Sequence, residues 1–259
     1  MTNTPVNLHT KYQNLFIFLG FLFLTNAIIA EIIGTKIFSL EGTLGLPAAS
    51  ISLGGENFNF NLTAGVLLWP IVFILTDIIN EYYGRKGVKK LSFLAAGMLV
   101  YSFVMILAAI KLEPAEFWIY SKQQQGISEL DTAYNAILGQ GTFIIIGSLV
   151  AFLVGQMVDA FVFTQVKKRT GNNMIWLRAT GSTLVSQFID SYVVLFIAFY
   201  FGADWSVTTV LKVGTVNYIY KLGVALLLTP MLYVIHGWID RYLGAELSKK
   251  MMKTAMENE

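Results

Sequence analysis

Polar and ionisable side chains recur inside long apolar stretches of the sequence, and eight of them form pairs at helical spacing. Residues three or four positions apart lie on one face of a helix, so each pair predicts a polar face. Such groups are costly in apolar surroundings, so these faces should point into a helical bundle. The pairs are Asp77 with Glu81, Gln156 with Asp159, Gln187 with Asp190, and Asn217 with Lys221.

Two roles are open to these side chains. Gln and Asp can join helices through interhelical hydrogen bonds, or they can bind a polar ligand in a cavity. Seven titratable groups in or bordering the apolar stretches favour a cavity, because packing alone does not need so many. They are Glu31, Lys36, Asp77, Glu81, Asp159, Asp190 and Lys221.

The composition places these groups in a membrane protein. Of the 259 residues, 55% are hydrophobic and 13% are charged, whereas a soluble domain has roughly a quarter charged residues. The chain contains no Cys, which excludes a disulfide scaffold and a Cys-ligated zinc site. The composition also excludes a disordered chain and a nucleic-acid binder that depends on a basic surface, and we expect no metal or other cofactor.

Six apolar segments are long enough to cross a bilayer as helices. A hydrocarbon core about 30 Å thick requires about 20 apolar residues per helix. We therefore expect an all-α integral membrane protein of six transmembrane helices, with residues 1–259 forming a single transmembrane domain. The approximate spans are residues 15–33, 62–79, 91–110, 137–163, 183–201 and 216–236.

The distribution of Lys and Arg predicts the orientation. Cytoplasmic loops retain basic residues, so the side with more of them should face the cytoplasm. Thirteen Lys and Arg residues lie in the two tails and in the loops after the second and fourth spans, and three lie on the opposite side. Both termini are therefore expected in the cytoplasm. The basic residues assigned to the cytoplasmic loops include Arg85, Lys86, Lys167 and Arg178.

This orientation places acidic groups toward the cytoplasm and a lysine above them. At about 1.5 Å per residue, Asp77, Asp159 and Asp190 all lie in the inner halves of their spans. Asn26 lies near the middle of the bilayer. Lys221 falls in the outer half of the sixth span, where we expect it to neutralise one of the acids.

Small residues and outer loops suggest how the helices pack. Gly147, Ala151 and Gly155 form a ridge of small side chains that suits close contact between helices. Residues 40–61, rich in Gly and Asn, predict a short hairpin or plug. Residues 112–135 carry aromatic and acidic groups and predict an interfacial helix.

The dipeptide Trp69-Pro70 lies in the second span. Pro70 is expected to kink the helix, because proline removes a backbone hydrogen bond. Trp69 either stacks on a flat ligand or packs against neighbouring helices.

Five longer segments stand out in order along the chain. They are TNAIIAEIIGTKIF, LWPIVFILTDIINEYYG, LVGQMVDAFVF, RATGSTLVSQFIDSYVVLFIAF and NYIYKLGVALLLTPMLYVI. Together they resemble the queuosine precursor transporter family, also called a vitamin uptake transporter-like family. The resemblance covers residues 14–240 and is specific because the five segments occur together.

The resemblance implies a bacterial inner-membrane protein that imports 7-cyano-7-deazaguanine, 7-aminomethyl-7-deazaguanine or queuine for transfer RNA modification. It also implies a fold similar to the substrate-binding components of energy-coupling-factor importers. The expected cavity suits such a ligand, because a carboxylate can accept two adjacent N–H donors and an aromatic ring can stack. Candidate substrate contacts are Asn26, Trp69, Asp77, Gln156, Asp159, Gln187, Asp190, Asn217, Tyr220 and Lys221, and candidates for coupling or gating are Glu31, Lys36 and Glu81.

Other interpretations stay open. The first is a substrate-binding subunit for another vitamin-like or purine-like molecule, which would need a separate energising module because the chain has no P-loop. If this chain acts alone, its uptake would be coupled to protons or would be facilitated diffusion. Whether the chain forms a homodimer also stays open. The remote alternative is an intramembrane enzyme. The sequence does not contain the Gly-x-Ser-x-Gly motif of a serine nucleophile. We expect a transporter with no catalytic residue and no nucleic-acid partner.

Overall fold

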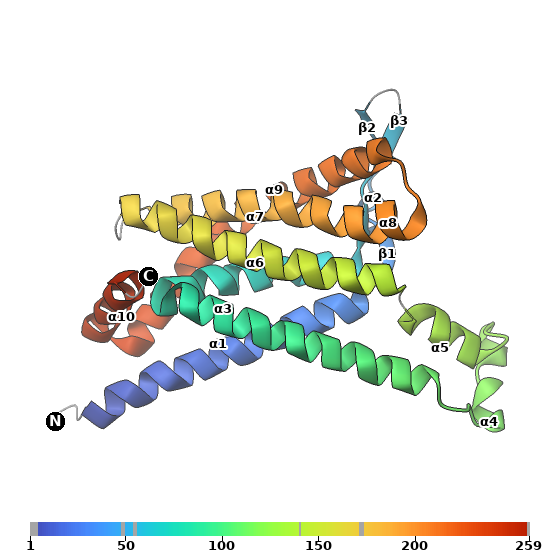
Figure 1. The fold of residues 1–259 in the computed structure, drawn as a ribbon, viewed down its shortest axis with the longest axis horizontal. Coiled ribbons are helices and arrows are strands. Elements are labelled where there is room, and N and C mark those ends of the chain that lie inside the picture. The colour runs from blue at the N-terminus through green and yellow to red at the C-terminus, as the bar shows by residue number, and fades with distance from the viewer. Residues whose placement is uncertain (1–4, 48–49, 54–55, 140, 171–173, 258–259) are drawn as a thin grey trace.

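The computed structural model describes residues 5–47, 50–53, 56–139, 141–170 and 174–257 of the chain. Five helical stretches of this described part are long and apolar enough to cross a membrane. The all-α class expected from the sequence is confirmed, apart from short strands near the end of the first helix. The long helices in these stretches are α1 (Pro5–Ile33), α3 (Trp69–Ile110), α6 (Thr142–Thr170), α7 (Ile175–Leu195) and α9 (Val207–Leu243), drawn in Figure 1.

Helix α3 contains most of the second predicted span and all of the third, and it reverses direction between them. Its 42 residues are interrupted at Gly84, whose backbone angles (φ 68°, ψ −176°) are not helical. A positive φ with an extended ψ is open to glycine and strained for other residues. Figure 1 shows the second half of α3 running back from this point, and Leu91 there packs against Gly20 of α1. Gly84 therefore forms the bend of a helical hairpin.

The second span begins later than the sequence predicted. Residues 61–63 form a strand, and the 3₁₀ helix η1 (Ala64–Leu67) leads into α3. Pro70 lies in the first turn of α3, where a backbone N–H has no intrahelical acceptor in any case. The expected kink at Pro70 is therefore wrong, because the proline begins the helix and does not interrupt it.

Helices α6 and α7 pack closely along the ridge of small residues. A Cβ atom on Gly147 would lie 3.2 Å from the carbonyl oxygen of Val194. One on Gly155 would lie 3.6 Å from Cβ of Asp190, and Ala151 between them is buried. The close contact predicted for this ridge is confirmed, and it holds Asp190 against α6.

Short strands occupy the segment between α1 and α3. The antiparallel pairs are β1 (Ile37–Ser39) with β4 (Asn61–Thr63) and β2 (Ser50–Leu53) with β3 (Glu56–Asn59). Helix α2 (Leu40–Leu44) follows β1, and its Glu41 carboxylate accepts hydrogen bonds from the backbone N–H of Phe60 and the hydroxyl of Ser39. These hydrogen bonds lower the pKa of Glu41, and the bond from Phe60 has the largest effect. The hairpin expected over residues 40–61 is confirmed.

The segment between α3 and α6 and the C-terminal segment are also helical. The Trp118 and Tyr134 rings meet edge to face with centroids 6.0 Å apart, which joins two short helices of the segment between α3 and α6. A helix is therefore present where the sequence predicted one, and its place at a membrane interface stays a prediction. The remaining elements are α4 (Glu116–Ile119), η2 (Gln123–Gln125), α5 (Leu130–Leu138), the π-helix η3 (Phe196–Tyr200), α8 (Phe201–Ala203) and α10 (Ala245–Glu257).

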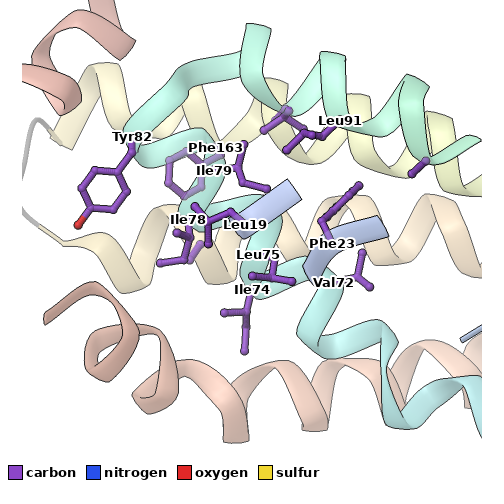
Figure 2. Close-up of a cluster of buried hydrophobic side chains, with 14 of the residues drawn as sticks. Leu19, Phe23, Val72, Ile74, Leu75, Ile78, Ile79, Tyr82, Leu91 and Phe163 are labelled. Atoms are coloured by element: carbon purple, nitrogen blue, oxygen red, sulfur yellow. The ribbon is translucent and has the colours of Figure 1, made fainter. Parts of the chain in front are cut away.

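The apolar core lies where α1, both halves of α3 and α6 meet, as Figure 2 shows. Leu19 and Phe23 of α1 are buried in one cluster with Val72 and Leu91 of α3 and Phe163 of α6. The outside of the long helices carries many exposed large apolar side chains, as expected for a surface in contact with lipid. The polar groups of the spans must therefore lie between the helices.

Candidate functional site

A cavity of about 270 Å³ lies among α1, α3, α6, α7 and α9, next to strand β4; it is called the larger cavity below. Five of the ten residues predicted to contact a substrate line it, and so does Glu31, which was predicted to act in coupling or gating. Its polar and aromatic lining residues include Glu31, Trp69, Ser148, Asp190, Asn217, Tyr220 and Lys221.

An ion pair crosses this cavity from α7 to α9. The ammonium of Lys221 lies 2.5 Å from a carboxylate oxygen of Asp190, and both side chains are about one fifth exposed. The sequence predicted that Lys221 neutralises one of the acids, and the structure identifies Asp190 as that acid. Because both groups line the cavity, a ligand there can exchange hydrogen bonds with either partner.

A second carboxyl faces the same cavity from α1. Glu31 is 9% exposed, and the hydroxyl of Ser148 on α6 hydrogen-bonds to it. Asp190 acts on Glu31 electrostatically, so the two acids are near neighbours. Together with Lys221, the larger cavity presents two carboxyls and one ammonium. The carboxyls can accept hydrogen bonds from one small polar molecule, and the ammonium can donate to it.

Aromatic rings supply flat apolar surface at the same place. Trp69 and Tyr220 line the larger cavity, and the Trp69 ring packs against Phe152 with centroids 5.8 Å apart. Trp69 is held close to η1, because a Cβ atom on Gly65 would lie 3.2 Å from its indole nitrogen. The sequence left open whether Trp69 packs or faces a ligand, and the structure allows both for different parts of the side chain.

A smaller cavity of about 60 Å³ adjoins the larger one between α3, α7 and α9. Trp69, Tyr220 and Lys221 line both cavities, so the two share a wall. Two further predicted residues, Asp77 and Gln187, line only the smaller cavity. The predicted substrate contacts are therefore divided between two neighbouring spaces.

Behind the smaller cavity lies a buried polar layer that joins α3, α6 and α7. The hydroxyl of Thr76 donates to Gln156 at 2.7 Å, and that of Ser186 donates to Asp159 at 3.0 Å. The amide of Asn80 donates to the carbonyl of Ala160. Gln156 and Asp159 are fully buried and line neither cavity. In the structure, these two residues hydrogen-bond to side chains of neighbouring helices and do not face a cavity.

An ion cluster adjoins this layer, and sequence reasoning missed it. Glu81 accepts from Arg178 at 2.8 Å and lies 3.2 Å from the ammonium of Lys167, which also donates to the Glu81 carbonyl. The assignment of both cations to a loop is wrong, because they lie in α6 and α7 and are almost completely buried. The apolar run Ile175–Trp176–Leu177 before Arg178 is the signal that α7 starts early.

Two other predicted residues lie apart from both cavities. The Asn26 amide donates to the Leu22 carbonyl of its own helix at 2.7 Å, and Lys36 is exposed directly before β1. Among the described residues, no group of three or more His, Asp or Glu side chains is arranged to hold a metal ion.

Comparison with known proteins gives two kinds of match. The family model described as "Putative vitamin uptake transporter" matches residues 63–235. A "Probable queuosine precursor transporter" of Bacillus subtilis (strain 168) is 29% identical over 182 residues, which are 69% of this chain and 73% of the relative. A protein of the same name from Haemophilus influenzae is 28% identical over 209 residues, 77% of this chain and 80% of the relative. No solved structure matches the chain.

Proposed function

Because the chain belongs to the vitamin uptake transporter family, we propose that it imports a 7-deazaguanine precursor of queuosine across the bacterial inner membrane. The family inferred from the sequence is confirmed by the match over residues 63–235, and the family is one of transporters and not of enzymes. The names of two relatives, both queuosine precursor transporters, support the choice of substrate class.

The observation that carries the proposal is the set of groups around the larger cavity. A 7-deazaguanine presents adjacent N–H donors on its pyrimidine edge, which a carboxylate such as Glu31 can accept as a pair. Its carbonyl can accept from Lys221, and its flat face can stack on Trp69 or Tyr220. A volume of about 270 Å³ lies just below the ~300–1,000 Å³ of sites for drug-sized ligands, which suits a single bicyclic ring system.

The proposed membrane arrangement has six crossings with both termini in the cytoplasm. The reversal at Gly84 supports it, because it turns α3 into two antiparallel spans. Arg85, Lys86, Lys89 and Lys90 follow the bend directly, and basic residues favour the cytoplasmic side. Since the chain has no Cys, a single Cys introduced at Gln124 or at Lys249 gives a clean test. A membrane-impermeant thiol reagent should label the first variant in intact spheroplasts and the second only after permeabilisation.

The function is tested by uptake in a bacterial host that lacks queuosine precursor synthesis and its own importer. Expression of this chain should restore queuosine in transfer RNA when 7-cyano-7-deazaguanine, 7-aminomethyl-7-deazaguanine or queuine is supplied at low concentration. Each precursor is supplied separately, so the result also names the substrate. If no precursor restores queuosine although the protein is present in the membrane fraction, the proposed substrate class is wrong.

A further inference from the structure

Two carboxyls lie buried between α3, α6 and α7 without being part of the larger cavity. Asp77 on α3 is 4% exposed and Asp159 on α6 is fully buried. Each is approached by a serine of α7, Ser182 at 3.4 Å from Asp77 and Ser186 at 3.0 Å from Asp159. The two acids also act on each other electrostatically. They form one site, which we call the aspartate pair.

Neither member of the aspartate pair forms an ion pair with a basic side chain within the described chain. Arg178 acts favourably on Asp77, but it is bound to Glu81, which acts in the opposite direction. The other titratable groups that neighbouring helices bring toward the pair are Lys167 on α6, Asp190 on α7, Tyr220 and Lys221 on α9 and, across the larger cavity, Glu31 on α1.

The charges of this buried region do not balance when all groups are ionised. The aspartate pair and Glu81 bring three carboxylates, whereas Lys167 and Arg178 bring two cations. Lys221 and Asp190 neutralise each other and leave the count unchanged. One uncompensated negative charge inside a membrane is costly, and one bound proton removes it.

The hydrogen bonds of Asp159 show where such a proton can reside. Its Oδ1 atom accepts from Ser186, whereas Oδ2 is buried and has no hydrogen-bond partner among the described groups. A carboxylate oxygen that is buried without a donor carries a large desolvation penalty. Protonation of the pair removes the charge that carries this penalty.

One face of α7 joins the aspartate pair to the larger cavity. Ser182, Ser186 and Asp190 are spaced four residues apart, so they lie along the same side of the helix. They contact Asp77, Asp159 and Lys221 respectively. Asp77 also lines the smaller cavity, which shares Lys221 and two aromatic residues with the larger one. One helix, α7, therefore contacts both the aspartate pair and a residue that lines the larger cavity.

We propose that Asp77 and Asp159 form a proton-binding site that couples uptake of the ligand to the inward movement of one proton. The proton enters from the outer side, occupies a carboxyl oxygen of the pair, and leaves to the cytoplasm, and no other bond forms or breaks. The coupling rests on the proposed uptake function, whereas the proton site itself does not.

The proton site is tested first without any ligand, by infrared spectroscopy of the full chain in lipid. The wild-type protein should show the carbonyl stretch of a protonated carboxyl at neutral pH. Asp159→Asn and Asp77→Asn should each abolish it, because either change balances the buried charges without a proton. Asp204→Asn is the matched control, since Asp204 is exposed with a left-handed backbone that Asn also tolerates, and it should retain the band. All of these proteins also carry Glu31→Gln, because the buried Glu31 carboxyl would contribute a band of its own when protonated. A band that persists in both pair variants would then overturn the proton site.

The coupling is tested in proteoliposomes with 7-cyano-7-deazaguanine and a clamped membrane potential. An inside-alkaline gradient of one pH unit should drive about tenfold accumulation by the wild-type protein, as expected for one proton and a neutral ligand. Asp159→Asn should lose this accumulation and retain ligand-for-ligand exchange. Exchange without pH-driven accumulation in the wild-type protein would overturn coupling and leave the uptake function standing. Absence of exchange with every precursor would instead contradict the uptake function, and the infrared result would still decide the proton site.

Discussion

The ammonium of Lys221 on α9 and the carboxylate of Asp190 on α7 lie 2.5 Å apart where the two cavities share a wall. Gly155 holds α6 against Asp190, so the acid is fixed by its own packing while Lys221 reaches it from a longer side chain. Both groups are partly exposed to the cavity, so a bound ligand can hydrogen-bond to either of them while the pair stays intact. Substitution of either member of this pair therefore tests whether the pair contributes to ligand binding.

Asp190→Asn should weaken binding of the transported precursor by about tenfold or more. The change replaces a carboxylate that lines the cavity with a neutral amide, and the lost hydrogen bond from the ligand to a charged group contributes about 1.5–3 kcal/mol. Affinity is measured on purified protein by isothermal titration. The double variant Asp190→Asn with Lys221→Met keeps the cavity neutral, so it should be as stable as the wild type. An unchanged affinity in Asp190→Asn would mean that the pair serves packing alone.

Glu31→Gln should remove the selectivity for the 2-amino group of the ligand. Asp190 is already engaged by Lys221, whereas Glu31 has a hydroxyl partner, Ser148, that a ligand can displace more easily. The comparison uses 7-deazaguanine and 7-deazahypoxanthine, which lacks the 2-amino group. The wild-type protein should prefer the former by about tenfold, and the variant should bind both alike.

Glu31→Asp, which keeps the charge, is the control for that comparison and should preserve a preference for 7-deazaguanine. If Glu31→Gln keeps the full preference while Asp190→Asn loses it, the edge of the ligand is bound by Asp190 and the assignment of Glu31 is wrong.

Much of the fold follows from the sequence because the apolar segments leave few alternatives to membrane helices. The ridge at Gly147, Ala151 and Gly155 also predicted a contact that the structure contains. Helix ends were harder to predict. The start of α3 depends on the strand pairing of residues 61–63 with residues 37–39, which is a tertiary contact that local composition does not encode.

The sequence predicted which residue types form the candidate site, but it predicted less well which of these residues lie together. Helical spacing identified Gln156 with Asp159 and Gln187 with Asp190, but spacing cannot tell which face of a helix meets a cavity. In the structure Asp190 lines the larger cavity, whereas Asp159 is buried behind it. The partner of Glu81 was missed because Arg178 is 97 residues away in the chain and was assigned to a loop.

Glu81→Gln should destabilise the folded protein by about 3–5 kcal/mol, because it leaves Lys167 and Arg178 buried without their carboxylate. The measurement is thermal or chemical unfolding in detergent, followed by the ellipticity of the helices. Adding Lys167→Met to Glu81→Gln removes one of the two cations that lost this carboxylate and should recover part of the loss.

The control for this change is Glu246→Gln in α10, which alters the same side chain at an exposed position and should shift stability by less than about 0.5 kcal/mol. Equal effects of Glu81→Gln and Glu246→Gln would show that the ion cluster contributes nothing to stability.

Gly84→Ala should prevent correct folding, because the backbone at this bend (φ 68°, ψ −176°) is strained for any residue with a Cβ atom. The cost of such strain is about 1–3 kcal/mol, and relief by straightening α3 would separate the two spans that the hairpin brings together. Gly97→Ala in the same helix is the matched control, since no atom lies within 4 Å of the added Cβ. That variant should gain up to about 1 kcal/mol from helix propensity. Both are compared by the yield of monodisperse protein from the membrane and by unfolding temperature, and a Gly84→Ala protein as stable as Gly97→Ala would refute the role of the bend.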